Sequence, residues 1–459
     1  MGTVKGAKRL LKTLRAAGFE AWLVGGSVRD LQLGLTPKDF DITTSATPEQ
    51  VKPLFRRVIP TGEKHGTVTV IAGGKPYEVT TYRRDVECDG RHAVVETSTS
   101  LEEDLGRRDF TVNAMALDPF TEQIVDPFGG RADLQARLLR CVGDPARRFD
   151  EDHLRLMRAV RFAAQLDFEL EPATWRALVE KAPLLERVSR ERIADELWAL
   201  LGARAAGRGL ALLDSSGLLP LILPELAAMK GVEQPGKWHH LDVFAHSRLA
   251  FERAVELTDD PVTRLALLLH DVGKPPTASS SDGDIHFYGH EHEGAKMIPG
   301  VVERLKLSSS RRVALDAKQL TLRLQTLVRL HMRPQQAAGA GLVALRRLAR
   351  QAGPYLDELL VVARADRMAH RDPDTSQLDR LQQKIRELGD ALKMHELQSP
   401  LSGEEIMRLL DLPPGPAVGR AKQALVDALV DGELAADPDQ ARAWLREHWP
   451  RRASAKPEP

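Results

Sequence analysis

The strand-like segments of this chain are confined to its first 143 residues, and this limits the possible folds more than any other feature. Four short apolar runs end there in glycine or polar turns: AWLVGG at 21–26, FDIT at 40–43, TVTVIAGG at 67–74 and YEVTTY at 77–82. From about residue 144 onward the patterns have the spacing of helices. The sequence therefore predicts an α+β head followed by all-α domains.

Changes in pattern divide the 459 residues into five parts. We predict a catalytic head over 1–143, a helical neck over 144–225, a histidine-rich helical domain over 226–372, a charged helical tail over 373–450 and a disordered end over 451–459. Residues 4–17 alternate basic and apolar residues at helical spacing, which indicates an amphipathic first helix rather than a signal peptide.

Composition limits where such a chain can act. Only Cys88 and Cys141 are present, which fits a reducing compartment, and no run of about 18 apolar residues could span a membrane. We therefore expect a cytoplasmic protein with no membrane partner, of undefined oligomeric state. Lys+Arg and Asp+Glu both total 65, so an RNA surface would have to be local. Residues 301–350, with 11 basic and 2 acidic residues, are either such a surface or a set of solvated helix faces.

Two carboxylates in residues 23–43 give the first indication of chemistry. Asp39 and Asp41 lie two apart in an expected strand, so both side chains share one face. Such a pair repels unless a divalent cation lies between, and Mg²⁺ is typically held by one or two carboxylates plus substrate phosphates. An exposed Asp-x-Asp at a strand end is the alternative. Glu78, on a neighbouring expected strand, is either a third carboxylate or a structural residue.

A glycine turn precedes these carboxylates. Gly25 and Gly26 follow an apolar strand, where glycine lets backbone N–H groups approach phosphates closely, and Arg29 lies on the next expected helix. A strand, a Gly-Gly turn, a helix and then Asp-x-Asp together predict a nucleoside triphosphate site.

These residues also carry a family resemblance. GGSVRD…LG…KDFDI resembles the first motif of the DNA polymerase β-like nucleotidyltransferases, in particular the bacterial tRNA nucleotidyltransferase and poly(A) polymerase family, and RRDFTVNAMA at 107–116 resembles the second. The resemblance continues through DPFGG at 126–130 and RFDEDHLRLMRAVRFAAQL at 148–166. It implies that Asp39 and Asp41 bind Mg²⁺ and that Asn113 supports the site. It also implies nucleotide contacts from Gly26, Arg29 and Arg108.

EDHLR at 151–155 predicts how a base could be selected. Asp152 and Arg155 are three apart in a helical pattern and so share a face. A carboxylate only accepts hydrogen bonds and a guanidinium only donates them. Cytosine and adenine both offer an amino donor beside a ring-nitrogen acceptor, whereas uracil and guanine place a carbonyl against the carboxylate. One Asp/Arg pair can therefore accept C and A and reject U and G.

A surface ion pair of little energetic value is the alternative for these two residues. The resemblance favours base selection, because the Glu-Asp-x-x-Arg motif of the family is matched here. Arg158 and Arg161 follow at helical spacing, where they would reach the base or the triphosphate, or else serve as ordinary solubilising arginines.

The resemblance implies template-independent addition of C, C and A from CTP and ATP to the 3′ end of tRNA. The tail sequence at 399–426 resembles HD-bearing tRNA nucleotidyltransferases, which favours tRNA over poly(A) synthesis. Residues 85–105 are about two residues shorter than the family pattern. An A-adding-only enzyme, a CC-adding-only enzyme and a poly(A) polymerase therefore stay open. A catalytically inactive, nucleotide-binding regulatory protein is the alternative of a different class.

A second resemblance lies in the histidine-rich domain. HHLDVFAHSRLAFERA at 239–254 and HDVGKP at 270–275 resemble the HD metal-dependent phosphohydrolase superfamily. The resemblance implies a metal site formed by His246, His270, Asp271 and Asp366. Imidazole and carboxylate ligands suit Mn²⁺, Ni²⁺, Co²⁺ or Zn²⁺. His290 and His331 are candidates for a second metal position, whereas His286 is expected in a surface or loop role. Phosphatase or 2′,3′-cyclic phosphodiesterase activity is implied.

Overall fold

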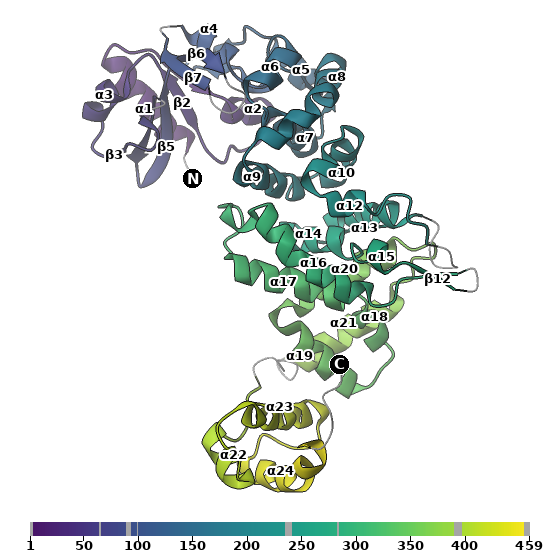
Figure 1. The fold of residues 1–459 in the computed structure, drawn as a ribbon. Helices are drawn as coiled ribbons and strands as arrows, with labels where there is room; N and C mark the ends of the chain where they lie inside the picture. The colour runs from purple at the N-terminus through teal and green to yellow at the C-terminus, as the bar shows by residue number, and fades with distance from the viewer. Residues whose placement is uncertain are drawn as a thin grey trace. The chain divides into compact units, whose positions relative to one another are not determined.

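The structure is a computed structural model and describes residues 3–63, 66–88, 93–98, 100–234, 241–281, 284–389 and 397–453. The chain forms two compact units (Figure 1). The first contains Met1–Pro224 and Arg304–Ala314, and the second contains Glu225–Glu303 and Leu315–Pro459. The return of residues 304–314 to the first unit was not predicted from the sequence. The finer division into head, neck, HD domain and tail stays a prediction.

A mixed sheet with strand order β3-β4-β5-β2-β1-β8-β9 forms the centre of the head. Its strands are β1 (Ala21–Val24), β2 (Asp41–Thr44), β3 (Val58–Ile59), β4 (Thr67–Ala72), β5 (Lys75–Thr81), β8 (Ala116–Leu117) and β9 (Ile124–Val125). All four predicted strands are therefore confirmed, with small shifts at their ends. The two-residue strands β3, β8 and β9 were not predicted, because two positions are too few to show an alternating pattern.

The sheet places functional residues on its central strands. Strand β2 is parallel to β5, with Asp41 beside Glu78, and antiparallel to β1, with Asp41 beside Val24. The first helix covers this sheet with an apolar stripe whose members are Ala7, Leu10, Leu11 and Leu14. This spacing is that of one helix face, so the predicted amphipathic first helix is confirmed.

The remaining elements of the first unit are mostly helical. Two short ladders pair β6 (Arg83–Cys88) with β7 (Ala93–Thr97) and β10 (Leu138–Leu139) with β11 (Glu169–Leu170). The α-helices are α1 (Val4–Ala16), α2 (Gly26–Gln32), α3 (Pro48–Val51), α4 (Leu101–Gly106), α5 (Gly130–Ala136), α6 (Pro145–Glu151), α7 (Arg155–Leu166), α8 (Pro172–Lys181), α9 (Arg190–Leu201), α10 (Ala206–Ser215) and α11 (Leu219–Ile222). The 3₁₀ turns are η1 (Lys52–Leu54), η3 (Thr111–Asn113), η4 (Ala182–Arg187) and η5 (Leu307–Ser309).

In its described residues, the second unit is helical apart from one hairpin, β12 (Ser279–Ser281) with β13 (Asp284–His286). Its helices are α12 (Pro224–Ala227), α13 (Val243–Leu257), α14 (Pro261–Leu269), α15 (Lys274–Thr277), α16 (His290–Arg304), α17 (Ala317–Leu330), α18 (Arg333–Ala337), α19 (Leu342–Ala352), η6 (Gly353–Tyr355), α20 (Leu356–Met368), α21 (Ser376–Leu388), α22 (Gly403–Leu410), α23 (Pro416–Asp431) and α24 (Pro438–Ala453). Helix α14 is apolar around most of its circumference and lies between α13, α17 and α20. The α+β head followed by helical domains is thus confirmed.

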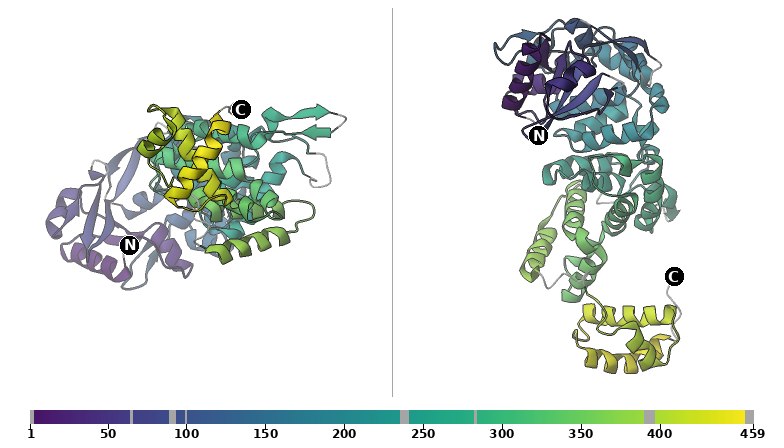
Figure 2. Two further views of the ribbon diagram at one scale, coloured as in Figure 1. Left: turned by 90° about the horizontal axis from the view of Figure 1, so that it is seen from below. Right: turned by 90° about the vertical axis from the view of Figure 1, so that its left-hand side faces the viewer.

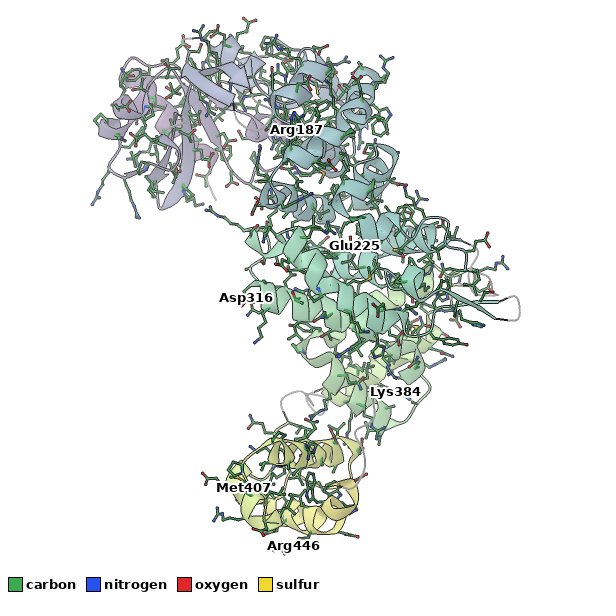
Figure 3. All side chains as sticks on the ribbon, viewed as in Figure 1. Arg187, Glu225, Asp316, Lys384, Met407 and Arg446 are labelled. Atoms are coloured by element: carbon green, nitrogen blue, oxygen red, sulfur yellow. The ribbon has the colours of Figure 1, made fainter. Side chains whose placement is uncertain are left out.

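Helices α22, α23 and α24 share a core of their own. Leu425, Ile406 and Leu445 are buried there, and Met407 packs against the same cluster (Figure 3). Helix α24 runs through Ala453, so residues 451–453 are helical and the expected disorder was wrong for them. Residues 454–459 lie outside the described part of the chain. Within the described ranges, no helix combines the length and the apolarity needed to cross a membrane.

Candidate active site

The turn after β1 is held close to two functional side chains. Gly25 has a φ of 70° and immediately precedes helix α2, which begins at Gly26. A Cβ atom at Gly25 would lie 2.8 Å from Nη1 of Arg108 and 3.5 Å from Oδ2 of Asp41. The backbone angle therefore favours glycine at this position, and a Cβ atom would press on the flexible end of the Arg108 side chain.

The two carboxylates lie at the start of β2, although only one belongs to the strand. Strand β2 begins at Asp41, so the prediction of a strand that includes Asp39 was wrong; both side chains nevertheless line one cavity. Burial raises the pKa of the Asp41 carboxyl to about 6; Arg108 opposes this rise, while the negative charges of Glu78 and Asp39 add to it. Glu78 is exposed and is not among the described residues that line the cavity.

One cavity of about 870 Å³ in the first unit contains the predicted nucleotide residues. Its lining includes Gly25, Gly26, Arg29, Asp39, Asp41, Arg108, Asn113, Asp152, Arg155, Arg158, Arg161, Phe162 and Arg312. Side chains from β2, α2 and α7 therefore meet around a single space, and positive charge faces the two carboxylates.

The segment predicted to select the base is not one continuous helix, although its sequence pattern predicted one. Helix α6 ends at Glu151, Asp152 has an extended backbone with φ −151° and ψ 105°, and Arg155 is the first residue of α7. The Asp152 carboxylate accepts hydrogen bonds from Nη2 of Arg192 at 2.9 and 3.1 Å. It is still about one quarter exposed, and it lines the same cavity as Arg155.

Arg155 is held in place by three hydrogen bonds. Its Nη1 donates to the Arg148 carbonyl oxygen at 2.9 Å and to Oε2 of Glu151 at 2.7 Å, and its Nη2 donates to the Arg107 carbonyl oxygen at 3.0 Å. A guanidinium carries five N–H donors, so two remain for a ligand. The broken helix thus leaves an acceptor and a fixed donor on one cavity wall.

A buried polar chain connects the arginines of the cavity. Arg29 donates from Nη1 to Oδ1 of Asn113 at 2.8 Å, and Asn113 donates to Oδ1 of Asp109 at 3.1 Å. The other oxygen of Asp109 accepts from Nε and Nη2 of Arg158 at 2.8 and 2.5 Å. Burial opposes ionisation of Asp109, but Arg158 and Asn113 hold its pKa well below the usual range. Sequence reasoning assigned no role to Asp109, because its partners are 4 and 49 residues away.

Three guanidinium groups also surround the ring of Phe162. The central carbons of Arg29, Arg158 and Arg161 lie 5.3, 5.2 and 3.6 Å from the ring centre. Arg161 donates to the Glu196 carboxylate, which reduces repulsion among these cations. Cations are attracted to an aromatic face, so Phe162 fixes the positive wall of the cavity. The sequence patterns assigned no role to Phe162.

Arg312 reaches the cavity from the returning segment 304–314. Nε1 of Trp198 donates to the Leu307 carbonyl oxygen at 2.9 Å, and Oγ of Ser310 donates to the Asp195 carboxylate at 2.5 Å. These contacts anchor the segment on α9. Of the basic region 301–350, residues 304–314 lie in the first unit and residues 301–303 and 315–350 in the second, so the region does not belong to a single unit. Arg323 in the second part is already bonded to Asp260 and Glu358.

Gly25→Ala is expected to reduce nucleotide addition at least about 100-fold, because the new Cβ would displace the Arg108 guanidinium from its place in the cavity. Gly34→Ala is the matched control: Gly34 has a φ of 71°, but no atom lies within 4 Å of its Cβ position. The control should lose about 1–2 kcal/mol of folding free energy and retain its activity. Steady-state addition and thermal unfolding of both variants test this, and equal activity losses would contradict it.

Magnesium dependence should vary with pH. Because the pKa of Asp41 is raised to about 6, its carboxyl is ionised above that pH and increasingly protonated below it. A cation competes with this proton, so its affinity should fall roughly tenfold per pH unit below pH 6. Measuring the Mg²⁺ concentration that gives half-maximal addition between pH 5 and pH 8 tests the sign. A constant requirement across this range would contradict it.

A second group of titratable side chains lies in the second unit. His246 is on α13, His270 and Asp271 follow α14, and Asp366 is on α20; all four are buried. Nε2 of His246 lies 2.9 Å from Oδ1 of Asp366, and Nε2 of His270 lies 3.2 Å from Oδ2 of Asp271. The possible ligand atoms of His246, His270 and Asp366 all lie within 4.8 Å of one another.

The two additional histidines extend this cluster. His270, Asp271 and His331 form a second set of ligand atoms within 4.8 Å of one another. Nε2 of His290 lies 3.4 Å from Oδ1 of Asp271 and 3.4 Å from Nε2 of His331. Asp271 therefore lies between two groups of candidate ligands.

Hydrogen bonds determine which ring nitrogens face the cluster. Nδ1 of His270, His290 and His331 lies 2.6, 2.8 and 2.7 Å from the carbonyl oxygens of Leu267, Phe287 and Val328. A carbonyl only accepts, so each Nδ1 carries a proton, and in the neutral ring Nε2 then has the lone pair for a metal ion. Among the described residues, the buried Nε2 of His270 has no hydrogen-bond partner. These donor atoms fit a divalent cation.

The pKa values of His270 and His331 indicate that the histidine cluster of the second unit attracts positive charge. Burial lowers the pKa of His270, but Asp271 and Asp366 outweigh burial and raise it to about 10. Burial lowers the pKa of His331 to about 4, and the neighbouring His270 adds to this effect. The carboxylates thus attract positive charge, which a metal ion also supplies, while His331 stays neutral.

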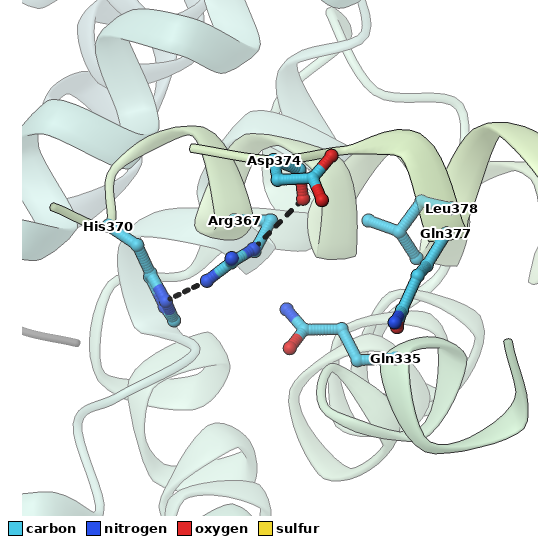
Figure 4. A pocket seen from close by; sticks show the side chains of 6 residues that line it. All are labelled: Gln335, Arg367, His370, Asp374, Gln377 and Leu378. Carbon is cyan, nitrogen blue, oxygen red and sulfur yellow. Dashed lines mark hydrogen bonds between the residues drawn. The ribbon is translucent and has the colours of Figure 1, made fainter. Parts of the chain in front are cut away.

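His370 has the opposite orientation. Nη1 of Arg367 lies 2.9 Å from Nδ1 of His370, and because a guanidinium only donates, Nδ1 is the acceptor and Nε2 carries the proton. That Nε2 lies 3.6 Å from Oδ1 of Asp366, so His370 orients the carboxylate rather than offering a lone pair. His370 also lines a cavity of about 280 Å³. Figure 4 shows the residues around this cavity: Gln335, Arg367, His370, Asp374, Gln377 and Leu378.

The first unit combines a mixed sheet, paired carboxylates and an arginine-lined cavity, which together define a metal-dependent nucleotidyltransferase. Family models agree: residues 21–140 match the poly A polymerase head domain, 167–230 match the probable RNA and SrmB-binding site of polymerase A, and 243–370 match the HD domain.

Full-length relatives narrow this class. The A-adding tRNA nucleotidyltransferase of Deinococcus radiodurans is 38% identical, over 93% of this chain and 95% of the relative. The CCA-adding enzyme of Streptococcus gordonii is 35% identical, over 95% and 96%. The crystal structure of the Bacillus stearothermophilus CCA-adding enzyme with CTP has 31% identity and a TM-score of 0.64, covering 98% of both chains. The chain belongs to the tRNA nucleotidyltransferase family, which includes the CCA-adding enzymes.

Proposed function

We propose that this protein adds C, C and A, taken from CTP and ATP, to the 3′ end of tRNA. The observation that carries this proposal is the single cavity that holds both Asp39/Asp41 and Asp152/Arg155. The first pair acts on phosphates and the second recognises a base, so one bound nucleotide can engage both. The names of the S. gordonii and B. stearothermophilus relatives support the same activity.

The chemistry is an in-line displacement. The 3′-hydroxyl oxygen of the tRNA forms a bond to the α-phosphorus, the bond between that phosphorus and the pyrophosphate oxygen breaks, and the hydroxyl proton is lost to solvent. Asp39 and Asp41 would hold Mg²⁺, which supplies charge neutralisation at the phosphates. Arg29, Arg108 and Arg158 line the same cavity and would contact the triphosphate. Catalysis then consists of positioning and electrostatic stabilisation.

The choice of tRNA primer distinguishes CCA addition from the narrower activities, which are A addition alone, CC addition alone and poly(A) synthesis. Three tRNAs, ending at the discriminator base, after one C and after two C residues, are incubated with CTP, ATP or both. A CCA-adding enzyme completes all three primers. An A-adding enzyme, the activity in the name of the D. radiodurans relative, extends only the last. A CC-adding enzyme stops before A, a poly(A) polymerase makes long tails, and an inactive regulatory protein extends nothing.

We further propose an HD-type phosphohydrolase, including 2′,3′-cyclic phosphodiesterase activity, in the second unit. The observation that favours it is the set of three Nε2 lone pairs arranged around Asp271. Hydrolysis adds a water oxygen to the phosphorus, breaks one bond between phosphorus and a ribose oxygen, and transfers a proton to that ribose oxygen. His246, His270, Asp271 and Asp366 would hold Mn²⁺, Ni²⁺, Co²⁺ or Zn²⁺, with His290 and His331 at a second position.

Asp271→Asn should separate the two activities. Removing the central negative charge should reduce hydrolysis of 2′,3′-cyclic AMP at least about 100-fold and lower the bound transition-metal content. CCA addition should stay within about twofold, because Asp271 lies in the other unit. Metal analysis, hydrolysis and tRNA extension are measured on one preparation. Loss of CCA addition in a folded variant would contradict the assignment of the two activities to separate sites.

A further inference from the structure

A third cavity begins at the histidine cluster of the second unit. It has a volume of about 420 Å³, and its lining includes Lys274, His286, Tyr288 and His290. His290 faces Asp271 with its Nε2, so the cavity begins at the candidate metal position. Figures 1 and 2 show the hairpin of β12 and β13 projecting from the second unit; its last residue, His286, lines this cavity.

Two stacked rings form part of the cavity wall. Tyr288 is 79% exposed, more than any other large hydrophobic side chain in the described part of the chain. Its ring stacks on that of His286, with centroids 5.1 Å apart and an interplanar angle of 15°. Gly289, with a φ of 75°, then turns the chain into α16 at His290. Folding thus leaves an ordered aromatic surface uncovered two residues from a candidate metal ligand.

A buried cation lines the same cavity. Lys274 is 7% exposed, and its Nζ lies 2.6 Å from Oε1 of Gln234 and 2.7 Å from Oδ2 of Asp271. An ammonium group has three N–H donors, so these two partners, taken among the described residues, leave one donor for a ligand. An anionic group beside Asp271 would meet this donor. The cavity therefore combines a place for a phosphate with an aromatic surface.

We propose that this cavity binds a nucleotide, with the nucleobase stacked on Tyr288 and the phosphate beside Lys274 and the histidine cluster. The proposal rests on the HD phosphohydrolase above, whose 2′,3′-cyclic phosphodiester substrates already carry a nucleoside, and it assigns the surface that holds the base. Every nucleobase has a π face, so the His286–Tyr288 ring pair would select for a base without reading its identity. A free nucleotide and an RNA 3′ end both present this chemistry.

Two cyclic phosphodiesters provide the first test. With the full-length, metal-loaded protein, Tyr288→Ala should raise the KM for 2′,3′-cyclic AMP about tenfold and leave hydrolysis of glycerol 1,2-cyclic phosphate, which has no base, unchanged. Tyr288→Phe keeps the ring and should behave as the wild type. Phe120→Ala removes an exposed aromatic residue of the first unit and is the matched control. Equal effects of Tyr288→Ala on both substrates would overturn the proposal.

A binding measurement keeps the test independent of hydrolysis. The probe is 2-aminopurine riboside 3′-monophosphate, added with saturating CTP to fill the other nucleotide site. Stacking should quench the fluorescence of the probe in the wild type and in Tyr288→Phe. In Tyr288→Ala, the dissociation constant obtained from this quenching should be about tenfold higher. Quenching without any hydrolysis would uphold the binding site and refute the phosphohydrolase; equal quenching in all three proteins would refute the binding site. A tRNA ending in a 2′,3′-cyclic phosphate, compared with 2′,3′-cyclic AMP, identifies the preferred source.

Discussion

Asp41→Asn is expected to reduce nucleotide addition at least about 1000-fold while the protein stays folded. Asp41 begins β2, lines the 870 Å³ cavity and lies beside Glu78 in the sheet. An amide keeps the shape of the carboxyl group but not the negative charge that a magnesium ion requires. Because the pKa of Asp41 is already raised to about 6 by burial, removing the charge should not destabilise the fold. Single-turnover extension of tRNA and thermal unfolding measure the two effects.

Glu78→Gln is the matched control for this substitution. Glu78 is also a carboxylate, on the neighbouring strand, but it is exposed and does not line the cavity. The activity of Glu78→Gln should fall less than about tenfold, because this variant loses only the influence of the Glu78 charge on Asp41. If Asp41→Asn retained a tenth of the wild-type rate, or if both variants lost equal activity, Asp41 would not be the principal carboxylate.

Asp152→Asn should relax base selection, which is the second large effect. The Asp152 carboxylate can only accept a hydrogen bond, so it favours the amino group of C or A and disfavours the carbonyl of U or G. An asparagine amide can turn its NH₂ group toward a carbonyl. The ratio of kcat/KM for CTP to that for UTP should therefore fall at least about 100-fold. Competition between the two nucleotides on a tRNA primer measures this ratio.

Asp150→Asn tests whether the effect is specific. Asp150 is two residues away and pairs with Lys181 at 2.8 Å, and it does not line the cavity. It should keep the wild-type ratio. A uniform loss of activity with all nucleotides in Asp152→Asn, without any change of ratio, would mean that Asp152 only orients Arg192 and does not contact the base.

Local signals in the sequence predicted much of this molecule. The four strands, the first helix and the α+β head were predicted because alternation, helical spacing and glycine turns depend on nearby residues. The same holds for the cavity residues, whose motifs occupy short segments. Two details differed from the sequence patterns: Asp39 lies before β2 rather than within it, and the helix breaks at Asp152. The Asp152 carboxylate accepts hydrogen bonds from the Leu154 backbone N–H and from Arg192, and the bond to Arg192, 40 residues away, has no local signal in the sequence.

Long-range pairings could not be predicted in the same way. Arg312 enters the nucleotide cavity because residues 304–314 pack on α9, more than 100 residues earlier in the chain. The basic composition of 301–350 gave no sign that it is divided between two units. Similarly, the resemblance implied the HD ligands, but only the hydrogen bond from Arg367 distinguishes His370, which orients a ligand, from His290 and His331, which offer lone pairs.

The most direct test of the central claim is the length of one reaction product. A tRNA ending at its discriminator base is incubated with the purified protein, Mg²⁺, CTP and ATP, and the product is analysed at nucleotide resolution. We expect a single product three residues longer, ending in CCA, which Asp41→Asn does not form. A primer left unextended, extended only by CC, or converted into a long A tail would contradict it.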